Sequence, residues 1–326
     1  MTIGIATRGT GAGLAAYHTL QAAEALGHGS IGGFAVFVWR EADGGLRHAT
    51  TQDHGSRGLT LSEGWREAGH AALISSGPNR PAPLLQFLPA DGAVGLVTGH
   101  RLPSSPLPDG AALNAHALAR MAAGGFDQAG LEALLASAPG LDAGLICLPL
   151  AGPCLIADAP RVRMRGDLGR FLHDGTATCA ILHNSIHTAQ LHGNALAAAL
   201  GGIALEVMGQ TRAAHVLTTL PDRLPVRPAA AEAVELDTTG AVRAVHSADP
   251  AYAGGRPRIT AIYASTPVVQ GGARVGTVLS EVFSTLEPWL LVQDVARHFV
   301  WRRDPPPRTL SPGRDPDTLA PRPPLP

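Results

Sequence analysis

The chain has 326 residues, of which 45% are hydrophobic and 16% are charged, and its formal net charge is −1. A chain of this length can bury a large core, and its balanced charge argues against nucleic acid or an anionic membrane as a partner. All 25 basic residues are arginines. The absence of lysine excludes a lysine Schiff base, a Ser-Lys catalytic pair and a P-loop ending in Gly-Lys-Ser/Thr.

The cysteines and the apolar segments indicate the cellular compartment of the protein. Three cysteines, an odd and sparse set, argue against a disulfide framework and fit a reducing compartment. No basic segment followed by a long apolar run opens the chain, and the most apolar stretch, ALAAALGGIAL, is too short to cross a bilayer. We therefore expect a cytoplasmic protein with no membrane partner.

Short apolar runs predict strands in the first half of the chain, and Ala- and Leu-rich stretches predict helices. The helix that starts at residue 12 ends naturally at Gly27, and Asp43-Gly44-Gly45 predicts a hairpin turn. The predicted strands are 3–7, 34–40, 46–51, 71–75, 93–98 and 143–149, and the predicted helices are 12–27, 111–122 and 128–137.

The second half of the chain is predicted to continue as strands around two helices. Strands are expected at 154–158, 177–182, 213–218, 232–236, 241–246, 259–264 and 274–279, and helices at about 186–208, with an N-cap at Asn184-Ser185, and about 283–300. Residues 303–326 are rich in proline and charge, so they predict a disordered tail after one globular domain of residues 1–302. The mixture of many predicted strands with several apolar helices predicts a layered α/β or α+β architecture.

The start of the chain, MTIGIAT, places the small residue Thr2 directly after the initiator methionine and at the head of a predicted strand. Methionine is usually removed before a small residue. A freed Thr2 would carry its hydroxyl beside an α-amine with a pKa of about 7.7–8.0. One residue could then serve as nucleophile and base in the hydrolysis of a small amide or peptide-like bond. The alternative is that Thr2 is an ordinary strand residue.

The order of elements after Thr2 extends this hypothesis. The strand and helix lead into GHGSIGGFAVF (27–37), a hairpin, DHGSRGL (53–59) and AVGLVTGHRLP (93–103). This order resembles the glutaminase domain of class II glutamine amidotransferases, in the N-terminal-nucleophile (Ntn) hydrolase superfamily, over residues 2–150. The resemblance implies an Ntn-hydrolase-like αββα layered sandwich, a small-molecule amide substrate and no cofactor. The chain departs from those amidotransferases because it has Thr where they use Cys.

The resemblance also implies roles for individual residues. Arg101, in the segment similar to the arginine-bearing strand, would bind a substrate carboxylate with its guanidinium fork. Asn114 would polarise the developing oxyanion. His28 and Ser30, in the segment GHGSIGGFAVF, would line the substrate site. Each has a simpler alternative, such as a surface arginine or an early helix residue.

The segment FLHDGTATCAILHNSIHTAQLHGN (171–194) is the other dense polar stretch. In the amide hypothesis, Asn184 and His187 complete the cleft, with His187 or His183 as an acid–base group. In a second hypothesis, His183, His187 and His192 bind a metal ion in a metal-dependent hydrolase or lyase. Thr176 follows Gly175 as in the self-cleavage junction of internally processed Ntn hydrolases, which makes it an alternative nucleophile.

A third hypothesis is a catalytically inactive Ntn-like subunit that binds or assembles with other chains. The low charge and the many small apolar residues would suit a homo-oligomer. Cys179 lies inside an apolar strand pattern, so we expect a buried, inert thiol. The segment GTGAG (9–13) lacks the full dinucleotide-binding spacing.

Overall fold

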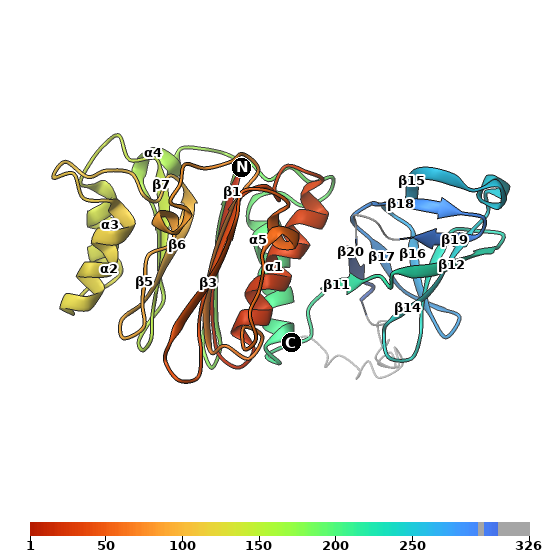
Figure 1. Ribbon diagram of the computed structural model, residues 1–326, viewed down its shortest axis with the longest axis horizontal. Helices are drawn as coiled ribbons and strands as arrows, with labels where there is room; N and C mark the ends of the chain where they lie inside the picture. Colours follow the sequence, from red (N-terminus) through yellow and green to blue (C-terminus); the bar gives the residue numbers. More distant parts are fainter. Residues whose placement is uncertain (293–296, 306–326) are drawn as a thin grey trace, which may run out of the picture.

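The computed structural model describes residues 1–292 and 297–305, and it confirms the α/β class (Figure 1). Its first part contains a six-stranded and a four-stranded sheet. In spatial order, the six-stranded sheet consists of β3 (Leu46–Thr51), β2 (Ala35–Arg40), β4 (His70–Ser76), β1 (Thr2–Arg8), β10 (Thr178–Asn184) and β9 (Leu168–Asp174). The four-stranded sheet consists of β5 (Ala90–Asp91), β6 (Gly95–Arg101), β7 (Ala143–Pro149) and β8 (Leu155–Asp158).

These two sheets are the inner layers of a four-layer sandwich (Figure 1). Helices α1 (Ala12–Gly27) and α5 (Gly193–Val207) cover the outer face of the six-stranded sheet through a core that includes Ile3, Ile5 and Leu200. The sheets face each other through a second core, and α2 (Leu113–Ala123) and α3 (Gln128–Ala136) cover the four-stranded sheet through a third. The order of layers is therefore helices, sheet, sheet, helices.

Strand β1 lies at the centre of the six-stranded sheet. It pairs antiparallel with β4 and β10, so that Thr2 lies opposite both Ser76 and Asn184. Its alternate residues Ile3 and Ile5 pack toward the helices, and Thr2 therefore points the other way, toward the four-stranded sheet.

Glycines let the two sheets approach closely near this strand. A Cβ added at Gly4 would lie 2.8 Å from the Cα of Gly99 on β6, which is closer than real Cβ atoms come to backbone. The sheets therefore meet backbone to backbone near the start of β1, where glycine in a strand marks such an approach.

The described residues from His215 to Arg303 include a ten-stranded sheet with its own core, which contains Val234, Val268, Leu291 and Phe299. In spatial order its strands are β11 (His215–Thr219), β20 (His298–Arg303), β17 (Ala273–Val278), β16 (Pro267–Gln270), β13 (Ala233–Leu236), β14 (Val242–Ser247), β12 (Arg223–Pro228), β19 (Leu290–Val292), β18 (Val282–Glu287) and β15 (Arg256–Ile262). Strands β11 and β20 are the part of this sheet that contacts α1 and α5. The range expected as one globular domain thus holds several separate cores, and the single domain stays a prediction.

The short helices complete the described chain. They are η1 (Gly55–Gly58), η2 (Leu84–Phe87), α4 (Pro160–Arg163) and η3 (Pro250–Gly254). No helix among the described residues is both long and apolar enough to cross a bilayer.

Two predicted helices differ from the structure. The helix expected at 283–300 is wrong, because β18 and β19 occupy its first part and β20 begins at His298, while residues 293–296 lie outside the described residues. Burial alternates along β18, with Val282, Ser284 and Leu286 buried, which is the period of a strand. Most of the tail, residues 306–326, also lies outside the described residues.

The helix expected at about 186–208 begins only at Gly193. The predicted N-cap at Asn184-Ser185 is wrong because β10 continues through Asn184 to pair with Thr2. Ser185 then takes a φ of 53°, in the left-handed region, and its N–H donates to the carbonyl of Asp167 at 3.0 Å. This bond turns the chain away from the sheet.

Candidate functional site

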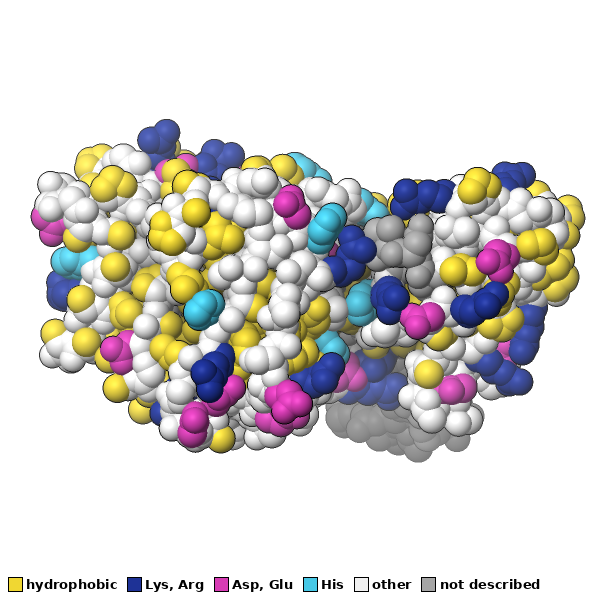
Figure 2. Space-filling view, in the orientation of Figure 1, with side chains coloured by type: hydrophobic (Ala, Val, Ile, Leu, Met, Phe, Trp, Pro, Cys, Tyr) yellow, Lys and Arg dark blue, Asp and Glu magenta, His cyan; other side chains and the backbone are white. Residues whose placement is uncertain are grey.

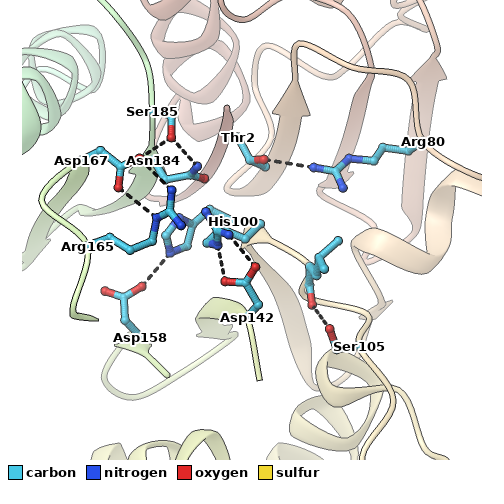
Figure 3. Close-up of polar contacts among 12 residues, drawn as sticks. Thr2, Arg80, His100, Ser105, Asp142, Asp158, Arg165, Asp167, Asn184 and Ser185 are labelled. Atoms are coloured by element: carbon cyan, nitrogen blue, oxygen red, sulfur yellow. Dashed lines mark hydrogen bonds and ion pairs between the residues drawn. The ribbon is translucent and has the colours of Figure 1, made fainter. Parts of the chain in front are cut away.

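Thr2 lies between the two sheets at the head of β1. It is 1% exposed, and its Oγ1 accepts a hydrogen bond of 3.1 Å from Nη2 of Arg80 (Figure 3). Met1 precedes it, with 40% of its surface exposed. The candidate nucleophile is thus a buried hydroxyl directly after the exposed first residue.

Arg80 supplies a positive charge at this hydroxyl. Its Nε donates to the Ser76 hydroxyl at 3.3 Å, and its backbone N–H donates to the Gln52 side chain at 3.0 Å. Burial and the nearby Arg101 lower the pKa of Arg80, and no carboxylate among the described residues forms an ion pair with it. A guanidinium of this kind is suited to an anionic group of a ligand. Arg80 could not be predicted from the sequence, because it lies in a loop 78 positions from Thr2.

Arg101 lies near the N-terminal amine, but its guanidinium is engaged. Its Nε and Nη2 donate to the two carboxylate oxygens of Asp142. Its backbone φ of 64° is unusual for a residue with a side chain. The fork expected to take a substrate carboxylate therefore holds a carboxylate of the chain itself.

The N-terminal amine, which Met1 carries, has a lowered pKa. The causes are burial first, then Arg80 and Arg101, with Asp167 acting in the opposite direction. An amine in this place therefore loses its proton below its ordinary pKa of 8.0. A neutral amine is the form that can accept a proton.

Asn184 flanks Thr2 on β10 and is tied to a polar loop. Its Nδ2 donates to the Ser185 hydroxyl at 3.0 Å, and that hydroxyl donates to the carboxylate of Asp167 (Figure 3). Burial acts to raise the pKa of Asp167, but the bonds from Ser185 and Arg165 outweigh it and bring the pKa to about 2. The carboxylate thus stays ionised and fixes the loop beside Asn184.

Arginine side chains gather at this end of the sandwich, over α4, as Figure 2 shows. Arg161, Arg163 and Arg165 are all exposed there. Arg161 and Arg165 lie close enough to Asp142 to contribute to its lowered pKa, after the larger effect of Arg101. The surroundings of the N-terminus therefore favour an anionic ligand.

A buried histidine–aspartate pair lies between the sheets. His100 is 0% exposed, and its Nε2 donates to Oδ1 of Asp158 at 2.6 Å (Figure 3). A Cβ at Gly144 would overlap both the His100 ring and the Asp158 carboxylate, so glycine there makes room for the pair. Sequence reasoning missed this pair because the two residues lie 58 positions apart.

The other residues expected to form the site are placed differently. Asn114 starts α2 and uses its Nδ2 to donate to the Gln86 carbonyl at 2.8 Å, so one of its amide hydrogens has a structural partner. His187 is exposed on the loop before α5. Ser30 lies near the N-terminus, because Gly77 is close to both residues. A Cβ placed on Gly77 would lie 2.9 Å from the Ser30 carbonyl oxygen and 3.7 Å from Cε of Met1.

His28 belongs to a separate cavity at the end of α1. This cavity of about 400 Å³ is lined by residues that include His28, His54, Glu24 and Ser56. Glu24 accepts hydrogen bonds from Ser56 N at 2.8 Å and Ser56 Oγ at 2.5 Å, and its burial raises its pKa to about 7. The structure therefore places His28 with Glu24 rather than with Thr2.

The metal hypothesis finds no support among the residues that the structure describes, where no three or more His, Cys, Asp or Glu side chains form a metal-binding group. His183 is buried, and its Nε2 donates to the Gly193 carbonyl at 3.1 Å. Burial, reinforced by His100, lowers the pKa of His183 to about 4. His187 and His192 are exposed. The three histidines expected to share a metal therefore do not meet.

The remaining candidates lie away from Thr2. Thr176 is exposed in the turn between β9 and β10 and donates to the Gln210 side chain. This turn is at the opposite end of the sheet, where Thr178 pairs with Arg8. Cys179 is buried, and burial raises the pKa of its thiol, as expected for an inert cysteine.

The fold and the site define an α/β sandwich protein with a buried threonine and an arginine at the head of its central strand. A family model described as a domain of unknown function (DUF6963) matches residues 2–217, so the chain belongs to that family. A second model, also described as a domain of unknown function (DUF7259), matches residues 223–293 of the ten-stranded sheet. No curated protein and no solved structure matches the chain.

Proposed function

We propose that the protein hydrolyses a small amide through Thr2, after removal of Met1 has freed the Thr2 amine. The observation that carries the proposal is the placement of the Thr2 hydroxyl between the sheets, held by Arg80 at 3.1 Å and beside an N-terminal amine whose pKa is lowered. The order of layers, with the nucleophile opening a central strand, supports assignment to an Ntn-hydrolase-like sandwich.

The chemistry follows from these groups. The neutral amine of Thr2 takes the proton of its own hydroxyl, and Oγ1 attacks the amide carbonyl carbon. The proton passes to the leaving nitrogen, and an ester remains on Thr2. Removing Met1 makes Thr2 itself the chain terminus, and we expect burial, Arg80 and Arg101, which lower the pKa of the Met1 amine, to act on the Thr2 amine in the same direction.

Arg80 takes the role first expected of Arg101. Its guanidinium touches Oγ1 and has no carboxylate partner in the described part of the chain, whereas Arg101 is bound to Asp142. It can hold a substrate carboxylate or the oxyanion that forms at the carbonyl. We therefore propose an amide that carries a carboxylate near the scissile bond as the substrate.

The test compares the wild type with Thr2→Ala and Thr2→Ser on a panel of p-nitroanilides of acetic, succinic and glutaric acids. Thr2→Ala should abolish turnover, and Thr2→Ser, which keeps a hydroxyl and favours methionine removal, should retain it. Thr176→Ala, at the far end of the sheet, is the matched control and should behave as wild type. Equal turnover by Thr2→Ala and wild type would refute the proposal, and no turnover by any protein would favour the inactive-subunit hypothesis.

A further inference from the structure

The His100–Asp158 pair belongs to the four-stranded sheet and faces the start of β1 on the six-stranded sheet. Two contacts fix the position of β6 on the six-stranded sheet. Thr98 donates to the carbonyl of Leu73, the neighbour of Ile5 on β4, at 2.9 Å, and the backbone of Gly99 abuts Gly4. These positions run antiparallel to β1. His100 therefore lies over the stretch between Gly4 and Thr2.

The His100 side chain points toward β1 and β10. Along β6, alternate side chains share a face, and Leu96 and Thr98 both face the six-stranded sheet. His100 is the next alternate residue after Thr98, so its side chain faces the six-stranded sheet as well. Its effect on the pKa of His183, which comes after that of burial, agrees with this placement, since His183 is next to Asn184.

Two atoms in this layer have no hydrogen-bond partner among the described residues, Nδ1 of His100 and Oδ1 of Asn184. Both residues are at most 2% exposed. Nε2 of His100 donates to Asp158, so in the neutral imidazole Nδ1 carries a lone pair. Both atoms are then acceptors, and unsatisfied buried acceptors are costly. A group that donates two hydrogens at once would satisfy both.

We propose that Nδ1 of His100 and Oδ1 of Asn184 hold the water that releases the acyl group from Thr2, with His100 as its base. This inference rests on the proposed function. The water donates one hydrogen to each acceptor, and its oxygen lone pair is free to attack the ester carbon. The water oxygen bonds to that carbon, and the ester bond to Oγ1 breaks. The proton taken by Nδ1 returns to Oγ1, and a carboxylic acid leaves.

Asp158 has a defined part in this step. Its carboxylate accepts from Nε2–H, which fixes the tautomer in which Nδ1 of the neutral imidazole carries the lone pair, and it stabilises the imidazolium when Nδ1 takes the proton. The pair is enclosed between the sheets, and the glycine at position 144 leaves room for the His100 ring and the Asp158 carboxylate.

The test separates acylation of Thr2 from its release. The probes are p-nitrophenyl acetate and p-nitrophenyl succinate, with p-nitrophenol followed by stopped flow. We expect His100→Asn to keep a burst of about one equivalent per active site and to lose about 10²-fold or more of the steady-state rate, as for loss of a general base. Intact mass should show the acyl group accumulating on Thr2, and added hydroxylamine, a stronger nucleophile than water, should restore turnover.

The controls make the outcomes distinct. His173→Asn, an exposed histidine at the far end of β9, should match wild type in burst and steady state. Asp158→Asn should show the same split as His100→Asn with a smaller loss, and it carries the test if His100→Asn does not fold. A wild-type steady-state rate in both variants, or an equal loss of burst and steady state without rescue by hydroxylamine, would overturn the inference. A wild type that never acylates Thr2 would instead refute the proposed function.

Discussion

Glu24 should make the protein less stable as the pH rises toward neutrality. Burial raises the pKa of Glu24 from 4.5 to about 7, although two hydrogen bonds from Ser56 act in the opposite direction. A group whose pKa is raised by folding binds its proton more tightly in the folded state. Its contribution to stability is therefore fully present below pH 4.5 and is lost as the pH rises through about 7.

The size of this effect follows from the pKa. A tenfold change in proton affinity is worth about 1.4 kcal/mol, so the rise to about 7 corresponds to roughly 3 kcal/mol at most. Glu24→Gln removes the titration and can still accept from Ser56 N–H and donate to Ser56 Oγ. The free energy of unfolding of Glu24→Gln, relative to that of the wild type, should therefore increase between pH 5 and pH 8.

Urea unfolding of both proteins at pH 5, 6, 7 and 8, followed by circular dichroism, measures this difference. Glu63→Gln, an exposed glutamate after η1, is the matched control and should show no such trend. A difference between Glu24→Gln and wild type that stays constant from pH 5 to pH 8 would show that the Glu24 carboxyl is not held in a buried place.

Three further predictions concern the Thr2 site. The kcat/KM for amide hydrolysis should rise with pH through an inflection below 8.0, because burial and two arginines lower the pKa of the terminal amine; a flat profile from pH 6 to 9 would contradict this. Arg80→Gln should lower the ratio of kcat/KM for a succinyl anilide to kcat/KM for an acetyl anilide by about 10- to 100-fold, because one charge-assisted hydrogen bond is lost. Arg101→Gln should leave this ratio unchanged. Gly4→Ala should cost about 1–3 kcal/mol in thermal or urea unfolding, because the new Cβ meets the backbone of Gly99; a neutral effect would argue against the close approach of the sheets.

Much of the first part of the fold could be predicted from local patterns. The helix at 12–27 is rich in Ala and Leu and ends at Gly27, and the strand at 143–149 is a short apolar run, so both lie where the sequence places them. The strand at 46–51 also does, because the Asp43-Gly44-Gly45 turn predicts a hairpin there. Strands with weak or mixed patterns were harder to recognise. β9, for example, has several exposed residues and was not predicted.

The site could be predicted only in part. Thr2 and Asn184 were found because each lies in a conspicuous segment, but their antiparallel pairing is a property of the sheet. Arg80 reaches Thr2 through closure of a loop, and His100 meets Asp158 because their strands belong to the sheet that stacks on β1. The usable signal for the stacking of the sheets was the glycine inside several strands, which marks close backbone approach. Gly4, Gly99 and Gly144 are such residues.

The central claim is that a freed Thr2 is the residue that carries the acyl group. Native protein is incubated with p-nitrophenyl succinate, quenched in acid and digested, and the mass of the N-terminal peptide is measured by tandem mass spectrometry. The account predicts that this peptide begins at Thr2, without Met1, and carries one succinyl group on the Thr2 hydroxyl. A peptide that retains Met1, or acylation confined to other residues, would contradict it.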